Sequence, residues 1–532
     1  MRAPEAMWLR GARIYPSAAA PPLEGGMLIR DGRVAALGRD EEIESAVPRG
    51  AQPIDLGGRV ILPGLVDAHM HFEQYALSAD LVDCGTSSLE ECLARVRGRA
   101  AELPPGNWIL GHGWNQNRWG RFGDRHDLDR AAPQHPVYLT AQSLHAGWAN
   151  TAALRLSSLE AAGSDPPNGK IGRAADGSPS GILFESAMSL VARAVPAPEP
   201  SELSRRMLLA QDRLWRLGLV AIHDFDGSRC FQALQSLHER SELGLRVVKN
   251  VPVEDLEAAV RLGLRSGFGD DWLRLGNIKV FADGALGPRT AAMLEPYDDD
   301  PANVGMALLD AEEILEKALR AGEAGWGMAV HAIGDRANHL VLDAFTELRR
   351  QEESRGWPAR RHRVEHLQLL HPEDLARPAG LGLIASMQPI HAVSDMDMAD
   401  RGWGSRVRHA YAWRSQRQLG AALAFGSDAP VESPNPFWGL HAAVTRRRPD
   451  GSPGPDGWIP QEKLTLAEAL TAFTEGPAYA AGLEAESGRL TPGFWADLIV
   501  LEMDPFEAGP ESLREMTPSG LMTGGVWRRR DF

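Results

Sequence analysis

The chain has 532 residues, of which 43% are hydrophobic and 24% are charged, and its formal net charge is -15. The composition is that of an ordinary globular protein, and the length suits a large α/β barrel with additional elements. The negative charge argues against capture of nucleic acid or of an anionic membrane surface. The first residues lack a signal-peptide core, no apolar run approaches a membrane-spanning helix, and the three cysteines match no disulfide framework. We therefore expect a cytoplasmic protein.

The first 62 residues have the pattern of short antiparallel strands. Apolar runs are separated by the turn signals Asp31-Gly32 and Gly57-Gly58, and Asp-Gly between such runs indicates a hairpin. A similar pattern of short apolar runs and turn signals returns only at the other end of the chain. We predict a small β-sandwich domain formed from both chain termini, residues 1–62 and 485–532.

The middle of the chain, residues 63–484, alternates apolar runs with helical periodicity, which indicates parallel βα units. The predicted strands are residues 66–71, 219–224, 245–251, 276–282, 327–333, 362–368, 383–389 and 421–427. Eight such repeats predict an α/β fold of the (β/α)8 TIM-like barrel type. The first gap is too long for one helix, so residues 72–215 are predicted to hold an insertion that covers the substrate at the carboxyl ends of the strands.

Histidines stand at the ends of the first, fifth and sixth predicted strands. His69 and His71 are two residues apart, so their side chains leave the first strand on one face and can bind one metal ion. His331 and His366 each follow an apolar run and precede a polar turn. A lone buried histidine is more often a hydrogen-bonded core residue than a ligand. Two at equivalent ends of consecutive strands favour a binding site.

A lysine and an aspartate complete the set. Lys279 lies inside the apolar fourth strand, where an ammonium is costly to bury unless it is paired or modified. In isolation, a snorkelling or ion-paired lysine is the simpler interpretation. Asp428 ends the eighth strand, where it is either a helix N-cap or, opposite the histidines, a catalytic base or metal ligand. Together the six residues suit Zn²⁺ or a similar first-row ion.

These motifs resemble the metal-dependent amidohydrolase superfamily, and more narrowly its branch of YtcJ-like and N-substituted formamide deformylase-like enzymes. The resemblance covers nearly the whole chain, and its motifs are residues 63–71, 281–290, 331–335, 365–366 and 426–430. It implies that His69, His71 and Asp428 bind one metal ion. It also implies that His331 and His366 bind a second.

The resemblance further implies that Lys279 is N-carboxylated and that its carbamate bridges the two ions. The lysine would then be a metal-paired anion, which removes the burial problem. We expect zinc, as one or two ions per chain. The hypothesis for activity is hydrolysis of a non-peptide, amide-type C–N bond of a small molecule. A hydroxide held by the metal centre attacks the carbonyl carbon, and Asp428 moves a proton from the nucleophile to the leaving nitrogen.

Two residues of the barrel are predicted to contact the substrate. His391, at the end of the seventh strand, is expected to bind the substrate or to stabilise the transition state. Arg289, after the glycine-rich turn of the fourth strand, pairs a substrate carboxylate or only stabilises its loop. The branch more usually has a small residue where Pro288 stands, so substrate contacts by this loop are less transferable.

The insertion contributes four further candidates. Trp114 and Asn115 suit a molecule with apolar and polar parts, although each tryptophan taken alone is better explained by packing. His145 resembles a recurrent insertion motif of the branch. Glu185 is likewise a candidate for substrate binding, and its alternative role is that of an internal salt-bridge partner.

Two other functions stay open at this point. A deaminase of the same superfamily typically has a mononuclear site without the fourth-strand lysine, and metal stoichiometry separates the two. A non-catalytic barrel used as a scaffold agrees poorly with the presence of all six ligand candidates. The expected partner is a small amide-type molecule, with neither nucleic acid nor a membrane, and a homodimer is left open.

Overall fold

The protein is seen here as a computed structural model that describes residues 6–78, 81–159, 164–196 and 198–532. At its centre lies an eight-stranded parallel sheet. In chain order its strands are β6 (Leu65–Met70), β13 (Leu219–Asp224), β14 (Arg246–Pro252), β15 (Leu273–Phe281), β16 (Met328–Ala332), β17 (Arg363–His366), β18 (Ile384–Met387) and β19 (Ala422–Phe425). The sheet closes because His71 N donates to Ala429 O (2.8 Å) and Asp428 N donates to His69 O (2.7 Å). The predicted barrel is confirmed.

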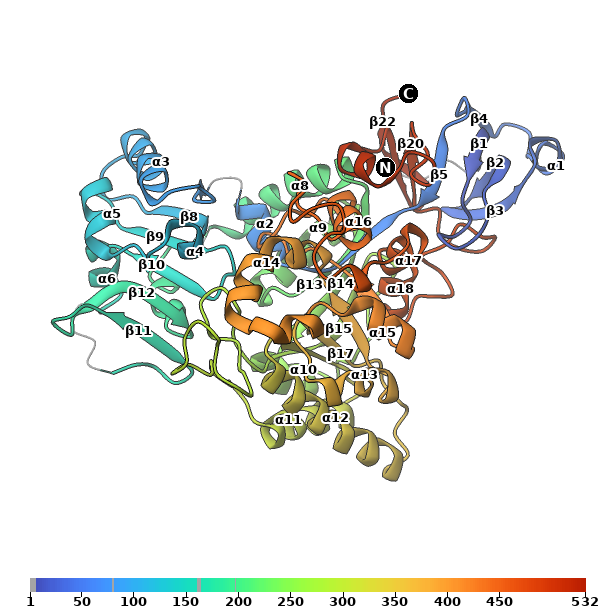
Figure 1. The fold of residues 1–532 in the computed structure, drawn as a ribbon. Coiled ribbons are helices and arrows are strands. Elements are labelled where there is room, and N and C mark those ends of the chain that lie inside the picture. Colours follow the sequence, from blue (N-terminus) through green and yellow to red (C-terminus); the bar gives the residue numbers. More distant parts are fainter. Residues whose placement is uncertain (1–5, 79–80, 160–163, 197) are drawn as a thin grey trace.

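Helices surround this barrel (Figure 1). They are α2 (Phe72–Ser78), α8 (Pro200–Arg216), α9 (Ser228–Glu239), α10 (Leu256–Arg261), α11 (Ala311–Glu323), α12 (Asp335–Ser354), α13 (Arg377–Gly380), α14 (Pro389–Trp403), α15 (Trp413–Leu419), α16 (Pro436–Thr445), α17 (Leu466–Ala472) and α18 (Glu475–Ala481). Helix α11 shows why they form. Asp310 and Glu313 make a capping box at its start, and Ile314, Ala318 and Ala321 are buried along one face.

Both ends of the chain build one further sheet, ordered β22-β21-β20-β5-β1-β2-β3 with β4 beside β1. Its strands are β1 (Ala6–Ile14), β2 (Leu23–Arg30), β3 (Arg33–Gly38), β4 (Gln52–Asp55), β5 (Val60–Pro63), β20 (Leu498–Leu501), β21 (Gly520–Thr523) and β22 (Val526–Arg530). Strands β5 and β20 pair antiparallel. Met27 and Ile29 share a core with Leu498 and Met522, while the short helix α1 (Asp40–Glu44) contributes Ile43 to a separate cluster. The prediction of a domain made from both termini is confirmed.

The insertion is a third body with its own sheet, ordered β11-β12-β10-β9-β8-β7 and seen at the left of Figure 1. Its elements are β7 (Val82–Asp83), α3 (Leu89–Glu102), β8 (Ile109–Trp114), α4 (Gln116–Trp119), α5 (Arg125–Ala131), β9 (Val137–Ala141), β10 (Ala146–Ala149), α6 (Thr151–Leu156), β11 (Gly169–Arg173), β12 (Pro179–Glu185) and α7 (Met188–Ala192). The loop between β9 and β10 reaches the barrel, where the His145 ring lies 5.2 Å from that of His331. Among the described helices, none is both long and apolar enough to cross a membrane.

Candidate metal centre

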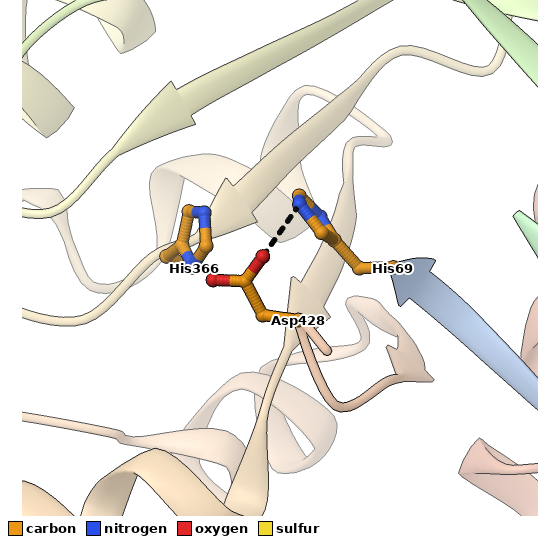
Figure 2. A group of neighbouring side chains, drawn as sticks. All are labelled: His69, His366 and Asp428. Carbon is orange, nitrogen blue, oxygen red and sulfur yellow. Dashed lines mark ion pairs between the residues drawn. The ribbon is translucent and has the colours of Figure 1, made fainter. Parts of the chain in front are cut away.

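Five of the predicted ligands meet at the mouth of the barrel. The Nε2 atoms of His69 and His71 lie 3.4 and 3.3 Å from Asp428 Oδ1. The ring of His366 lies 4.9 Å from that of His69 and 4.5 Å from that of His331. His69, His366 and Asp428 each offer one ligand atom, and these three atoms lie within 4.8 Å of one another. Figure 2 shows the Asp428 carboxylate between the two imidazole rings. Four of the five side chains are buried and that of His71 is partly exposed, so the site is set into the protein.

Each of the four histidines is held by one ring nitrogen from outside the centre. The pairs are His69 Nδ1 with Glu365 Oε2 (2.7 Å), His71 Nδ1 with Asp226 Oδ1 (3.1 Å), His331 Nε2 with Gly284 O (2.9 Å) and His366 Nδ1 with Gln388 Oε1 (3.0 Å). An acceptor on one nitrogen places the proton there and leaves the lone pair of the other nitrogen for a metal ion. His69 Nε2 shows this directly, because it is buried and has no hydrogen-bond partner in the described part of the chain.

Lys279 lies beside these rings without a polar partner. Its side chain is buried, and within the described residues its Nζ makes no hydrogen bond. The nitrogen lies 4.7 Å from the ring centroids of both Phe225 and Phe281. Burial lowers the pKa of Lys279 to about 8, and the carboxylates of Glu365 and Asp428 oppose this only in part. Because Lys279 is buried and pairs with no carboxylate among the described residues, neither the snorkelling nor the ion-paired alternative describes it. An orphaned buried amine close to the candidate ligand histidines fits a ligand of a metal centre.

Asp428 is kept ionised by its surroundings. Burial alone would raise the pKa of Asp428, but the contacts from His391 and His71 hold it well below its usual range. The two carboxylate oxygens face different ways, since Oδ1 faces the ligand histidines and Oδ2 lies 3.3 Å from His391 Nε2. The backbone of Asp428 is left-handed, with φ 61°, and such strain in a non-glycine residue is typical of functional sites.

Asp67 holds the loop that carries Asp428. Its Oδ1 accepts hydrogen bonds from the backbone N–H groups of His69 (3.1 Å) and Ser427 (3.0 Å), and its Oδ2 accepts one from the Ser427 hydroxyl (2.5 Å). The first strand is thereby tied to the turn after the last strand. With these three hydrogen bonds, Asp67 is placed to position the candidate ligands His69 and Asp428.

The orienting partners of the histidines were not predicted as site residues. Asp226 follows β13, and besides His71 it accepts hydrogen bonds from backbone N–H of Glu73 and Gln74. Glu365 is fully buried and paired with Arg363 two residues earlier. The signal available in the sequence was an arginine and a glutamate two residues apart, which lie on the same face of a buried strand. Sequence alone could not show that this pair reaches His69 across the barrel.

Removal of the Asp226 carboxylate is expected to weaken metal binding without unfolding the barrel. Asp226→Ala frees the His71 ring to rotate, and loss of such a partner typically costs 10- to 100-fold in metal affinity. Competition with a chelator of known affinity measures the change. Asp226→Asn keeps an acceptor oxygen and should lose less. Equal affinity in Asp226→Ala and the wild-type protein would contradict the role given to this carboxylate.

Two cavities open on the centre, and all the predicted substrate residues except Arg289 line one or both of them. The larger, of ≈ 630 Å³, is called the catalytic cavity here; its lining includes His69, His71, His145, Glu185, Lys279, Phe281, His331, His366 and Asp428. The smaller lies along α14 and the insertion; its lining includes Trp114, Asn115, His145, His391, Asp395, Asp428 and Glu432. The two cavities share His145, which pairs with Glu185 at 2.9 Å. Glu185 thus forms the internal salt bridge that was its alternative role, while it also lines the catalytic cavity.

Trp114, Asn115 and Arg289 have structural partners. Trp114 is 1% exposed and donates from Nε1 to Leu139 O (3.0 Å), so packing accounts for most of its ring. The Asn115 side chain caps α4. Arg289 forms an ion pair with Asp299 and is not among the described residues that line either cavity. The structure therefore brings His145, Glu185 and His391 to the centre, and not Arg289.

Comparison with known proteins agrees with this geometry. A model described as the amidohydrolase family matches residues 52–527. The putative amidohydrolase YtcJ of Bacillus subtilis is 32% identical over 520 residues, which cover 96% of each chain. N-substituted formamide deformylase of Arthrobacter pascens is 28% identical over 94% of each chain. An uncharacterized metal-dependent hydrolase from Pyrococcus horikoshii is 28% identical, with a TM-score of 0.78 over 95% of this chain and 99% of that structure. The chain therefore belongs to the amidohydrolase family of metal-dependent hydrolases.

Proposed function

We propose that this protein hydrolyses a non-peptide, amide-type C–N bond of a small molecule. The observation that carries the proposal is the cluster of His69, His366 and Asp428, whose ligand atoms lie within 4.8 Å of one another. Beside it stands the buried amine of Lys279, which has no hydrogen-bond partner among the described residues. This group opens on the catalytic cavity. Such a donor set suits zinc.

The candidate ligands would divide between two ions. His69, His71 and Asp428 would hold one ion, and His331 and His366 would hold the other. A carbamate on Lys279 would bind between them and would turn a costly buried ammonium into a paired anion. When bound, the metal lowers the pKa of a water molecule towards about 7 and polarises a carbonyl oxygen.

The protein's own groups supply the proton transfers and the orientation. Asp428 is ionised, so it can accept the proton of the attacking water and then deliver it to the leaving nitrogen. His391 fixes the Asp428 carboxylate through Oδ2. His145 has its Nδ1 engaged by Glu185, so Nε2 is the atom left to bond a substrate in the cavity.

A substrate screen tests the proposal. N-acyl, N-formyl and cyclic amides are offered to the purified protein, to the chelator-treated protein and to the protein reloaded with zinc. We expect turnover of at least one class, its loss after chelation and its return with zinc. Hydrolysis that survives complete metal removal would contradict the proposal, and so would release of ammonia from amino-heterocycles with no amide cleaved.

A further inference from the structure

A third cavity, of ≈ 480 Å³, is lined by residues of the barrel helix α2 and of the sheet of the insertion. We call it the apolar cavity. Much of its lining is hydrocarbon and includes Leu77, Leu110, Leu144, Ala192, Val195 and Pro430. No step of the proposed reaction uses this space. Its volume lies in the range of small-molecule sites.

The apolar cavity adjoins the catalytic cavity. Gln74 and Leu144 line both. Gln74 lies on α2, which begins directly after His71. Leu144 directly precedes His145. A side chain that borders two spaces forms the wall between them at that point. At these two points one side chain therefore separates the apolar cavity from the catalytic cavity.

Polar groups in its walls already have protein partners. His112 bonds Thr140 Oγ1 (2.9 Å) and Pro430 O (3.0 Å) through its two ring nitrogens. The charged and amide groups are likewise engaged, by the pairs Arg99 with Glu102 (3.0 Å), Arg206 with Glu202 (2.7 Å) and Gln74 with Asp226 (3.2 Å). A ligand that bonded one of these paired atoms would have to displace an existing partner. A hydrocarbon needs no such exchange and gains by leaving water.

We propose that the apolar cavity binds a hydrocarbon substituent of the substrate, which extends from the catalytic cavity past Leu144. This inference rests on the proposed function and names its substrate class: small amides that carry an alkyl chain or an aryl ring. The substituent belongs either to the acyl side or to the nitrogen side of the scissile bond. Both sources present the same chemistry to the cavity.

Two homologous series separate these sources. One lengthens the acyl chain of amides of a single amine, and the other lengthens the N-alkyl chain of formamides. In the series whose chain enters the cavity, kcat/KM should rise about fourfold per methylene until the cavity is full. Leu110→Ala enlarges the cavity and should move this limit to longer chains. A kcat/KM that is flat in both series, with at least one of them turned over, would overturn the inference and leave the proposed function standing.

A binding measurement keeps the inference testable even when no amide is hydrolysed. Calorimetry with 1-octanol, which has no scissile bond, compares the wild-type protein with Ala192→Trp and Arg193→Trp. Ala192 is an exposed residue of the cavity lining, so an indole there occupies the cavity, whereas its neighbour Arg193 does not line it. We expect binding in the wild-type protein and in Arg193→Trp, and at least roughly tenfold weaker binding in Ala192→Trp. Equal binding in all three proteins, or none in the wild type, would overturn the assignment.

Discussion

Asp428→Asn is expected to lower kcat by about 10²- to 10⁴-fold while the barrel stays folded. Asparagine has the same shape and can still accept a hydrogen bond from His391, but it cannot take a proton from water. Asp428 is also the residue that His69, His71 and His391 all approach. Loss of its charge removes both the proton acceptor and an anionic ligand.

Steady-state kinetics on the best substrate of the screen, together with circular dichroism, measure these two effects. Asp343→Asn, on the outer side of α12, is the control and should change neither, because its ion pair with Arg377 is partly exposed. A folded Asp428→Asn variant that keeps wild-type kcat would remove Asp428 from proton transfer.

Lys279→Met is expected to abolish activity and at the same time to stabilise the metal-free protein. Methionine fills a similar volume between Phe225 and Phe281 and carries no charge to desolvate. Lys249 provides the matched contrast, because it is equally buried but is paired with Asp224 at 2.7 Å. Lys249→Met leaves that carboxylate uncompensated and should destabilise the fold by about 3 kcal/mol or more. The two substitutions should therefore move the free energy of unfolding in opposite directions.

The same lysine predicts a pH dependence in the metal-free protein. An unfolded lysine keeps its proton to about pH 10.4, whereas burial lowers the pKa of Lys279 to about 8 in the folded chain. The unfolded state binds more protons between these values, so the wild-type protein gains stability as pH rises through this window. The gain is roughly 3 kcal/mol, and Lys279→Met should lack it. Denaturant unfolding at pH 7.5 and pH 10 measures this gain in the wild-type protein and in Lys279→Met. An identical pH response in the two proteins would contradict the presence of a buried Lys279 ammonium without a partner.

The barrel and its ligands could be predicted because parallel strands buried on both faces leave continuous apolar runs in the sequence. A polar residue at the end of such a run, as at His331 or His366, lies at the barrel mouth whatever the connections are. These two features were enough to place the six candidate ligands on their strands.

The partners of those ligands depend on which strands face one another across the barrel, and no local pattern records that. Gln388 reaches His366 from the neighbouring strand end, and Asp226 reaches His71 from β13. Arg289 shows the opposite failure, because a polar residue after a glycine-rich turn is equally suited to pairing with Asp299 in its own loop. The sheet of the insertion was also not predicted strand by strand, since its strands are short and only β10 among them is buried at every residue.

Metal analysis of the purified protein tests the central claim most directly. Elemental analysis of the wild-type protein should find between one and two equivalents of zinc or a similar divalent ion. His69→Ala and His366→Ala should each lose metal, whereas His441→Ala, which replaces a buried histidine of α16 outside the centre, should keep it. A wild-type protein that stays metal-free after reloading, or that keeps its metal in both ligand variants, would contradict the account.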